Sequence, residues 1–181
     1  MLFRSDDAGQ VAWADGAGID VIRGHGRLIG ERTVQVRTPD GGDSTLIARE
    51  AVIIATGTTA AIPAIPGMPE SLPWTSRDVT NMHQLPPRVA IIGGGVVACE
   101  AATWLIGLGA HVTVLSSGDL LARNEPFAGR LVADALRDAG ADVRLGATVR
   151  RVSRERPVDT GSGHIHGGPA RIDWESDGQA G

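Results

Sequence analysis

The sequence is poor in several residue types, and each shortage excludes a class of chemistry. Cys99 is the single cysteine, which excludes an internal disulfide and any paired-cysteine metal or redox motif. All 17 basic residues are arginine, so Schiff-base chemistry and a P-loop lysine are excluded. No tyrosine is present to act as a general acid.

Charge and hydrophobic run length exclude two further classes of partner. The formal net charge of -4 argues against nonspecific nucleic-acid binding, because there is no basic surplus to neutralise phosphates. No apolar run approaches the roughly 20 residues of a membrane helix. The first residues do not resemble a signal peptide, so the sequence predicts a cytoplasmic protein.

The most informative stretch is a glycine-rich turn between an apolar run and a helical pattern. Residues 89–92 are typical of a buried strand, and residues 96–108 have helical periodicity. Between them Gly93-x-Gly95-x-x-Ala98 matches the dinucleotide-binding fingerprint, with alanine in the third place. Gly93 permits the tight turn, Gly95 lets a pyrophosphate approach the backbone, and Ala98 allows close helix–strand packing. The predicted phosphate-binding segment is Gly93, Gly94, Gly95, Val96, Val97 and Ala98.

The pattern after this turn predicts a doubly wound half-domain. Residues 111–115 and 141–145 are typical of strands, and Pro126 begins a helix whose apolar stripe runs to Ala139. The order β-α-β-α-β predicts parallel strands joined by right-handed crossovers. The fold class is therefore α/β, a Rossmann-like half-domain.

The end of the strand at residues 111–115 bears on the choice between NAD and NADP. An NAD-binding protein carries an acidic residue there to bind the ribose 2′-OH, but this chain has Ser116 and Ser117, with Arg123 following. This favours NADP(H). Asp119 in the same loop keeps NAD(H) open, and the two serines are also compatible with a simple turn.

The first third of the chain predicts a separate, β-rich unit. Residues 1–17 have the pattern of the tail of a helix, and residues 19–23 that of a strand. Residues 33–38 and 45–49 predict a hairpin, and residues 51–55 a buried apolar strand that stops at Thr56-Gly57. The predicted divisions are 1–59 (β-rich unit), 60–87 (proline-rich linker without regular helix), 88–152 (nucleotide-binding unit) and 153–181 (glycine-rich tail). Residues 157–181 are expected to be poorly ordered, with residues 172–174 as a candidate lone strand.

Several motifs together resemble the FAD-dependent pyridine nucleotide-disulfide oxidoreductases, the family of dihydrolipoamide dehydrogenase, glutathione reductase and mercuric reductase. They are Val52-Ile-Ile-Ala-Thr-Gly57, Ile62-Pro-x-Ile-Pro-Gly67, Ile91 to Glu100, and Gly109-Ala-His-Val-Thr-Val-Leu115, in the family's order and at about its spacing. The resemblance covers roughly residues 10–152. It implies a partial FAD-binding domain at residues 1–59, with Thr56 and Gly57 near the flavin, and NAD(P)H bound at the glycine turn.

The same resemblance implies an activity and shows what the sequence lacks. NAD(P)H would pass hydride to the flavin, and the flavin would reduce a disulfide, a metal ion or another acceptor. The family's first glycine fingerprint, its redox cysteine pair and its C-terminal dimerisation domain have no counterpart here, so the resemblance predicts a central fragment of an enzyme whose intact relatives are homodimers. A catalytically inactive nucleotide-binding module and a nonfunctional gene fragment are the alternatives.

Glu100 has two interpretations. In the resembling enzymes a glutamate at this point lies near the nicotinamide, often paired with a lysine on the flavin side. Alternatively, Glu100 is an ordinary acidic residue near a helix N-terminus, favoured by the helix dipole. No residue is predicted as a proton donor or redox thiol, and Cys99 is expected to be buried.

Overall fold

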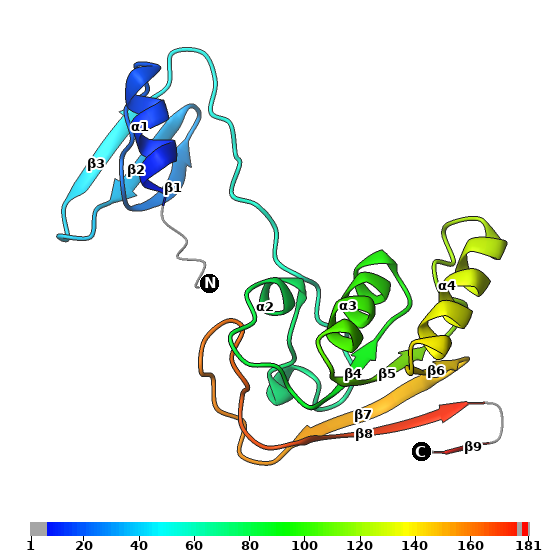
Figure 1. The fold of residues 1–181 in the computed structure, drawn as a ribbon. Helices are drawn as coiled ribbons and strands as arrows, with labels where there is room; N and C mark the ends of the chain where they lie inside the picture. The colour runs from blue at the N-terminus through cyan, green and yellow to red at the C-terminus, as the bar shows by residue number, and fades with distance from the viewer. Residues whose placement is uncertain (1–6, 177–178, 181) are drawn as a thin grey trace. The chain divides into compact units, whose positions relative to one another are not determined.

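The computed structural model describes residues 7–176 and 179–180, and it divides the chain into two compact units, Met1–Thr58 and Thr59–Gly181. Each unit is described by itself. Figure 1 gives the element labels used below.

Over residues 7–58, the first unit contains one helix and a small antiparallel sheet. Helix α1 spans Ala8–Gly16, and strands β1 (His25–Gly30), β2 (Thr33–Arg37) and β3 (Asp43–Ile47) follow in that order. The hairpin predicted from the Pro39–Gly42 turn signal is confirmed by the β2–β3 pairing, with Val34 opposite Leu46. The strand predicted at residues 19–23 is wrong: this segment has no regular structure, and the first strand begins at His25. Residues 1–6 of the predicted N-terminal helix lie outside the described part of the chain.

The prediction of a buried strand at residues 51–55 is also wrong. The segment is irregular, and the side chains of Ile53 and Ile54 are 88% and 71% exposed. An apolar run of this kind is typical of a strand covered on both faces. Over residues 7–58 the structure describes no strand paired with it, so the run has nothing to bury it.

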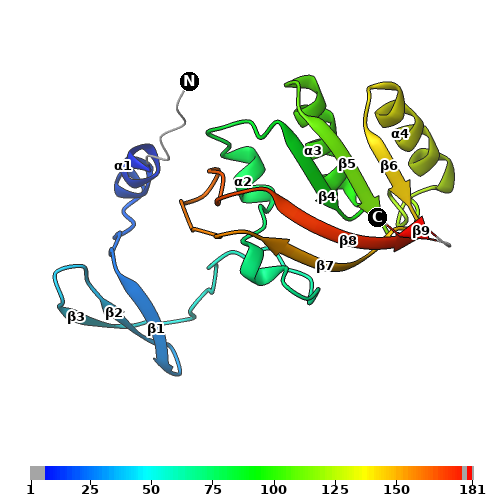
Figure 2. The ribbon, with the colours of Figure 1, turned by 90° about the horizontal axis from the view of Figure 1, so that it is seen from below.

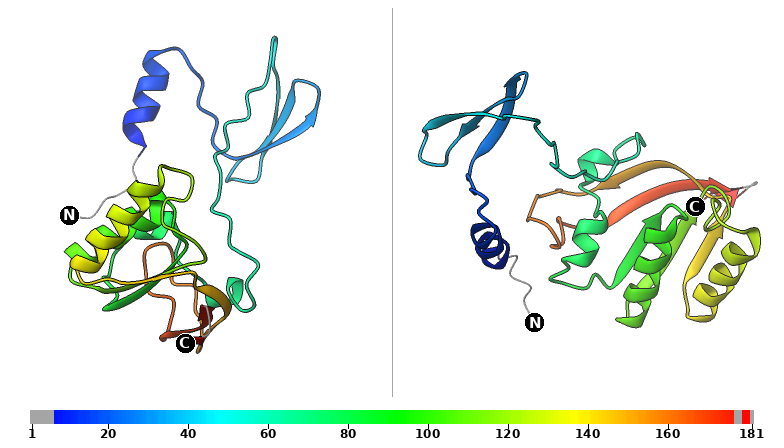
Figure 3. Two further views of the ribbon diagram at one scale, coloured as in Figure 1. Left: turned by 90° about the vertical axis from the view of Figure 1, so that its right-hand side faces the viewer. Right: turned by 90° about the horizontal axis from the view of Figure 1, so that it is seen from above.

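The second unit contains the predicted βαβαβ arrangement. Strands β4 (Arg88–Ile92), β5 (His111–Ser116) and β6 (Asp142–Leu145) form a parallel sheet in that order, connected by helices α3 (Val96–Gly107) and α4 (Pro126–Asp138). The predicted fold class is confirmed. The two helices lie side by side on one face of the sheet (Figure 3). The buried cluster between helices and strands consists of Cys99, Ala102, Leu105, Ala110, Val112, Val114, Leu120, Ala133, Leu136, Ala141 and Val143.

A second antiparallel sheet follows, where the sequence predicted a poorly ordered tail. Strands β7 (Thr148–Arg154) and β8 (Ala170–Ser176) pair with Val152 opposite Ile172, and β9 (Gln179–Ala180) pairs with β8. Figure 2 shows β7 and β8 on the side of the parallel sheet away from α3 and α4. The expectation of disorder is therefore wrong for residues 170–176, because Ile172 gains a partner that is far away in sequence; residues 177, 178 and 181 lie outside the described chain.

The proline-rich linker is hydrogen-bonded to strand β7 of the second antiparallel sheet, and it contains short helices. The Val152 amide donates to the Pro66 carbonyl over 2.9 Å, and Gly67 (φ +75°) lies so close to β7 that an added Cβ would collide with the Val152 carbonyl oxygen. A 3-10 helix, η1 (Pro69–Ser71), and helix α2 (Ser76–Thr80) follow. The prediction that prolines exclude helix fails at α2, because residues 74–85 contain no proline and Asp78 caps the helix start.

None of the helices in the described part of the chain is both long and apolar enough to cross a bilayer.

Asp78 is expected to stabilise the second unit through both of its carboxylate oxygens. Oδ2 accepts from the Thr75 amide (2.8 Å) and hydroxyl (2.9 Å), and Oδ1 accepts from the Gly163 amide (3.1 Å). Asp78→Ala should therefore lower the free energy of unfolding by about 1–2 kcal/mol, measured by urea denaturation. Asp134→Ala, which removes only an exposed ion pair with Arg137, should change it by less than about 0.5 kcal/mol.

The contribution of Asp78 should depend on pH in a defined direction. Burial alone would raise the pKa of the Asp78 carboxyl, but the hydrogen bonds from Thr75 and Gly163 together hold it below the ordinary 3.8. A carboxyl whose pKa is lower in the folded than in the unfolded state stabilises the fold at pH values above its unfolded pKa. This stabilisation is lost as the pH falls through its folded pKa. The difference between wild type and Asp78→Ala should thus be constant near neutrality and shrink below about pH 4. A difference that grows on acidification would contradict this assignment.

Candidate nucleotide-binding site

The glycine turn connects β4 to α3 with the geometry that its sequence predicts. Gly93 adopts φ +118°, which favours glycine, and its amide donates to the Leu115 carbonyl on β5 over 2.8 Å. Gly95 is the N-cap of α3, with extended φ -79° and ψ 177°. The chain therefore leaves the sheet and enters the helix within three residues.

The N-terminus of α3 is open. A Cβ added to Gly95 would meet no atom within 4 Å, and Gly95, Val96 and Val97 are exposed. Within α3, the first turn has no acidic residue and the N-cap has no side-chain hydrogen bond. The backbone amides and the positive end of the helix dipole are therefore accessible to an anion at this point.

Gly94 faces the opposite way and serves packing. An added Cβ there would lie 2.5 Å from Ser116 Oγ and 3.0 Å from Leu120 Cδ2. The Gly94 carbonyl accepts from the Leu121 amide over 2.7 Å. The glycine turn is therefore packed against the loop that follows β5, at the edge of the sheet where β4 and β5 end.

The structure separates the two serines that were predicted together. Ser116 is 4% exposed and packs against Gly94, and its carbonyl accepts from the Ala147 amide over 2.8 Å. Ser117 and Arg123 are exposed in the loop between β5 and α4. The exposed hydroxyl at this strand end is therefore that of Ser117, with the Arg123 guanidinium in the same loop.

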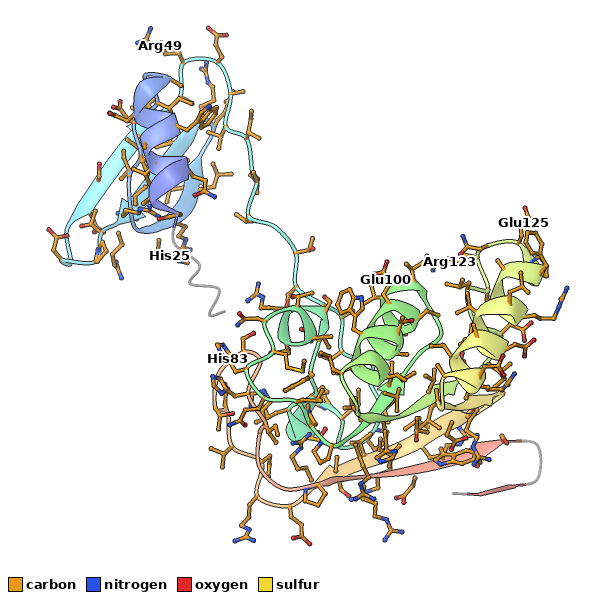
Figure 4. The ribbon with its side chains drawn as sticks, viewed as in Figure 1. His25, Arg49, His83, Glu100, Arg123 and Glu125 are labelled. Atoms are coloured by element: carbon orange, nitrogen blue, oxygen red, sulfur yellow. The ribbon has the colours of Figure 1, made fainter. Side chains whose placement is uncertain are left out.

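Two neighbouring residues of α3 differ in environment. Cys99 is buried, and burial, followed by the charge of Glu100, raises the pKa of its thiol, so it has the character of a packing residue. Ala98 is half-buried, and Glu100 is exposed. Figure 4 shows Glu100, Arg123 and Glu125 at the same end of the unit, where the N-termini of α3 and α4 lie.

Sequence reasoning missed two residues that shape the loop after β5. Leu121 adopts φ +52°, and Gly129 in α4 lies so close that an added Cβ would collide with the Leu120 carbonyl oxygen. A glycine inside the apolar stripe of a helix is a signal of close backbone approach, and it was readable in the sequence. Both residues hold the loop that carries Ser117 and Arg123.

Thr56 and Gly57 belong to the other unit. Both are exposed in an irregular segment, where Gly57 adopts φ +73°. Residues 7–58, as described, contain no turn of glycines between a strand and a helix. The residues present fit the pyrophosphate of a dinucleotide at Gly95, whereas residues 7–58, as described, form no cradle for FAD.

Histidine, cysteine and carboxylate side chains do not gather into a metal site in the described structure: no group of three or more is placed to hold an ion.

A family model and the similar known proteins indicate the same family. The family model described as "Pyridine nucleotide-disulphide oxidoreductase" matches residues 6–170. The mercuric reductase of Acidithiobacillus ferrooxidans is 38% identical over 125 residues, covering 69% of this chain and 23% of that protein. The glutathione reductase of Burkholderia cepacia is 34% identical over 145 residues, covering 78% of this chain and 30% of that protein.

The solved structures agree with this result. The Cu(II) complex of the HOCl-induced flavoprotein disulfide reductase RclA from Escherichia coli superposes with a TM-score of 0.71 at 29% identity, covering 92% of this chain and 35% of that chain. The chain therefore spans between about a quarter and a third of the length of these relatives. Homologues in this family are oxidoreductases that use FAD and NAD(P)H. The resemblance seen in the sequence is confirmed, and the chain belongs to the pyridine nucleotide-disulfide oxidoreductase family.

Proposed function

We propose that residues 88–152 bind NAD(P)H, and that the protein is part of a FAD-dependent NAD(P)H oxidoreductase. The observation that carries the proposal is the open backbone of Gly95 at the uncapped N-terminus of α3. Phosphates bind at such a terminus because unpaired amides and the helix dipole both favour negative charge. Membership of the family supports the same assignment.

Each residue of the fingerprint has its own part in this proposal. Gly93 makes the turn, Gly95 lets the pyrophosphate approach the main chain, and Ala98 keeps α3 close to the sheet. Val96 and Val97 supply first-turn amides of α3. Gly94 contributes by packing, since it holds the loop after β5 in place.

The ribose end of the site favours NADP(H) over NAD(H) in this proposal. Ser117 and Arg123 are exposed, whereas Ser116 is buried at the end of β5. A guanidinium binds a 2′-phosphate well, whereas an NAD site would present a carboxylate to the 2′-OH at the end of β5. Asp119, exposed in the same loop, is the residue that would serve NAD(H).

A bound flavin would supply the reducing chemistry, and this chain would hold the NAD(P)H that provides the hydride. Within this chain we assign Glu100 to the nicotinamide end, and Thr56 and Gly57 to the flavin side, on the family resemblance. Two relatives are named for mercuric ion and for glutathione, so metal ions and disulfides are the acceptor classes to test.

Location and assembly are part of the same proposal. A lone, buried cysteine is compatible with a reducing compartment such as the cytoplasm, where structural disulfides are rare. The family resemblance suggests that intact relatives are homodimers.

A nucleotide-binding module without turnover is the second candidate. It is favoured by the buried position of Cys99, which leaves no exposed thiol in the chain to exchange with a disulfide. Yellow flavin bound to the purified protein and oxidation of NADPH would support the oxidoreductase. A colourless protein whose melting temperature rises with NADPH would support the module.

Substitution of adjacent glycines should separate binding from packing. Gly95→Val places its side chain in open space, so we expect the fold to be kept and the NADPH-dependent rise in melting temperature to be lost. Gly94→Ala overpacks Ser116 and Leu120, so it should lower the free energy of unfolding by about 1–3 kcal/mol without nucleotide. Thermal melts with and without NADPH measure both effects. An unchanged NADPH shift in a folded Gly95→Val protein would refute the proposed site.

Arg123 should decide the preference for the 2′-phosphate. Arg123→Ala is expected to weaken NADPH binding about tenfold, because a charge-assisted contact is lost, and to leave NADH binding unchanged. Isothermal titration with both nucleotides measures the ratio. Arg130→Ala, which removes an exposed arginine from α4, is the matched control and should leave the ratio as in the wild type. Equal losses for NADH and NADPH would rule out a 2′-phosphate contact.

A further inference from the structure

The loop between β5 and α4, residues 117–125, is anchored where Leu120 passes between two glycines. Leu120 is 1% exposed, and its Cδ2 lies 3.0 Å from the position of a Cβ added to Gly94. The Leu120 carbonyl oxygen, in turn, lies so close to Gly129 of α4 that an added Cβ there would collide with it. We call Gly94, Leu120 and Gly129 the leucine clamp. It connects the glycine turn, the loop and α4 through one buried residue.

The residues that follow the clamp have a defined backbone. Leu121 adopts φ +52°, in the left-handed region, and its amide donates to the Gly94 carbonyl over 2.7 Å. The Leu121 carbonyl accepts from the Asn124 amide over 2.7 Å, which closes a four-residue turn. Arg123 is the third residue of this turn. The position of its backbone is therefore set by the clamp before any ligand binds.

Two exposed side chains of opposite charge flank the clamp. Asp119 precedes Leu120, and Arg123 follows it. In the proposed site a carboxylate would serve the 2′-OH of NAD(H), and a guanidinium would serve the 2′-phosphate of NADP(H). Within residues 7–176 and 179–180, neither of the two side chains forms an ion pair. The backbone of the loop is therefore what places both of them.

We propose that the leucine clamp determines specificity for the 2′-phosphate, with Gly129 as a positioning residue that acts through Arg123. This inference rests on the proposed function, because it concerns the same NADP(H) site. A guanidinium binds a phosphate best through two parallel hydrogen bonds, and such a contact needs a fixed approach. The clamp provides this approach in advance, so less conformational freedom is lost when NADPH binds. The ligand class is a dinucleotide with a phosphate on the adenosine ribose.

Gly129→Ala in the complete 181-residue chain tests the clamp. The added methyl group displaces the Leu120 carbonyl and the turn that carries Arg123, so the affinity for NADPH should fall about fivefold. The affinity for NADH should stay within about twofold of the wild type, because the Gly93 amide still bonds the Leu115 carbonyl and holds the glycine turn. Isothermal titration with each nucleotide measures both affinities.

Two further variants separate positioning from packing. Gly107→Ala makes the same change in α3, where an added Cβ would meet no atom within 4 Å, and it should leave the ratio of the two affinities unchanged. In a chain that already carries Arg123→Ala, adding Gly129→Ala should not change this ratio further, because no guanidinium is left to position. A merely structural role of Gly129 would instead weaken the binding of NADH and NADPH alike.

The outcomes distinguish this inference from the proposed function. Wild-type protein that binds neither nucleotide would refute the proposed function, and the clamp with it. Wild-type protein that binds both nucleotides with equal affinity would overturn the clamp and leave NAD(P)H binding in place. Where the wild type prefers NADPH, a folded Gly129→Ala protein that keeps this preference, or that loses affinity for both nucleotides equally, overturns the clamp alone.

A measurement on the wild type covers the case in which Gly129→Ala does not fold. Without nucleotide, the amides of Leu121 and Asn124 should exchange with solvent deuterium at least about tenfold more slowly than the amide of the exposed Gly118, after correction for intrinsic rates. The reason is that both amides are hydrogen-bonded in a loop that is already held in place. Equal exchange at the three positions would show that the loop is not set before binding, and it would overturn the proposal.

Discussion

The structure of the nucleotide-binding unit depends on the close approach of two loops at Gly94. Without a side chain there, Ser116 and Leu120 pack directly against the backbone, and the Leu121 amide bonds the Gly94 carbonyl. This contact is what leaves Gly95 facing outward with nothing beside it. Packing at one glycine and access at the next are therefore two features of one turn.

Several connections outside the parallel sheet make close backbone contacts at glycines. Gly67 lies against Val152, Gly163 lies against Asn81, and Gly129 lies against the carbonyl of Leu120. The linker, the loop of residues 159–166 and the loop after β5 each contain or meet one of these contacts. The first unit differs, because Ile53 and Ile54 are exposed and its described residues provide no strand to cover them.

Prediction from sequence succeeded where the pattern is local and dense. The βαβαβ order followed from short apolar runs, two amphipathic stripes and the glycine turn, all of which act over a few residues. It failed at residues 51–55 and at the pairing of β8 for opposite reasons. The first segment has the composition of a buried strand but no neighbour to pair with, and Ile172 in β8 has a neighbour, Val152, that lies far away along the chain. Strand pairing is a property of two segments, so one of them alone cannot reveal it.

For the site, the sequence by itself determined the residue types of the phosphate turn and the family that carries them. The fingerprint requires residues without side chains at fixed positions, and such residues can be recognised directly in the sequence. Only the tertiary structure decided that Gly94 packs while Gly95 stays open, that Ser116 is buried while Ser117 is exposed, and that the rings of His83 and His164 stack. These outcomes depend on which way each residue faces and on contacts between segments about 80 residues apart, such as Asp78 with Gly163, which local chain preferences do not encode.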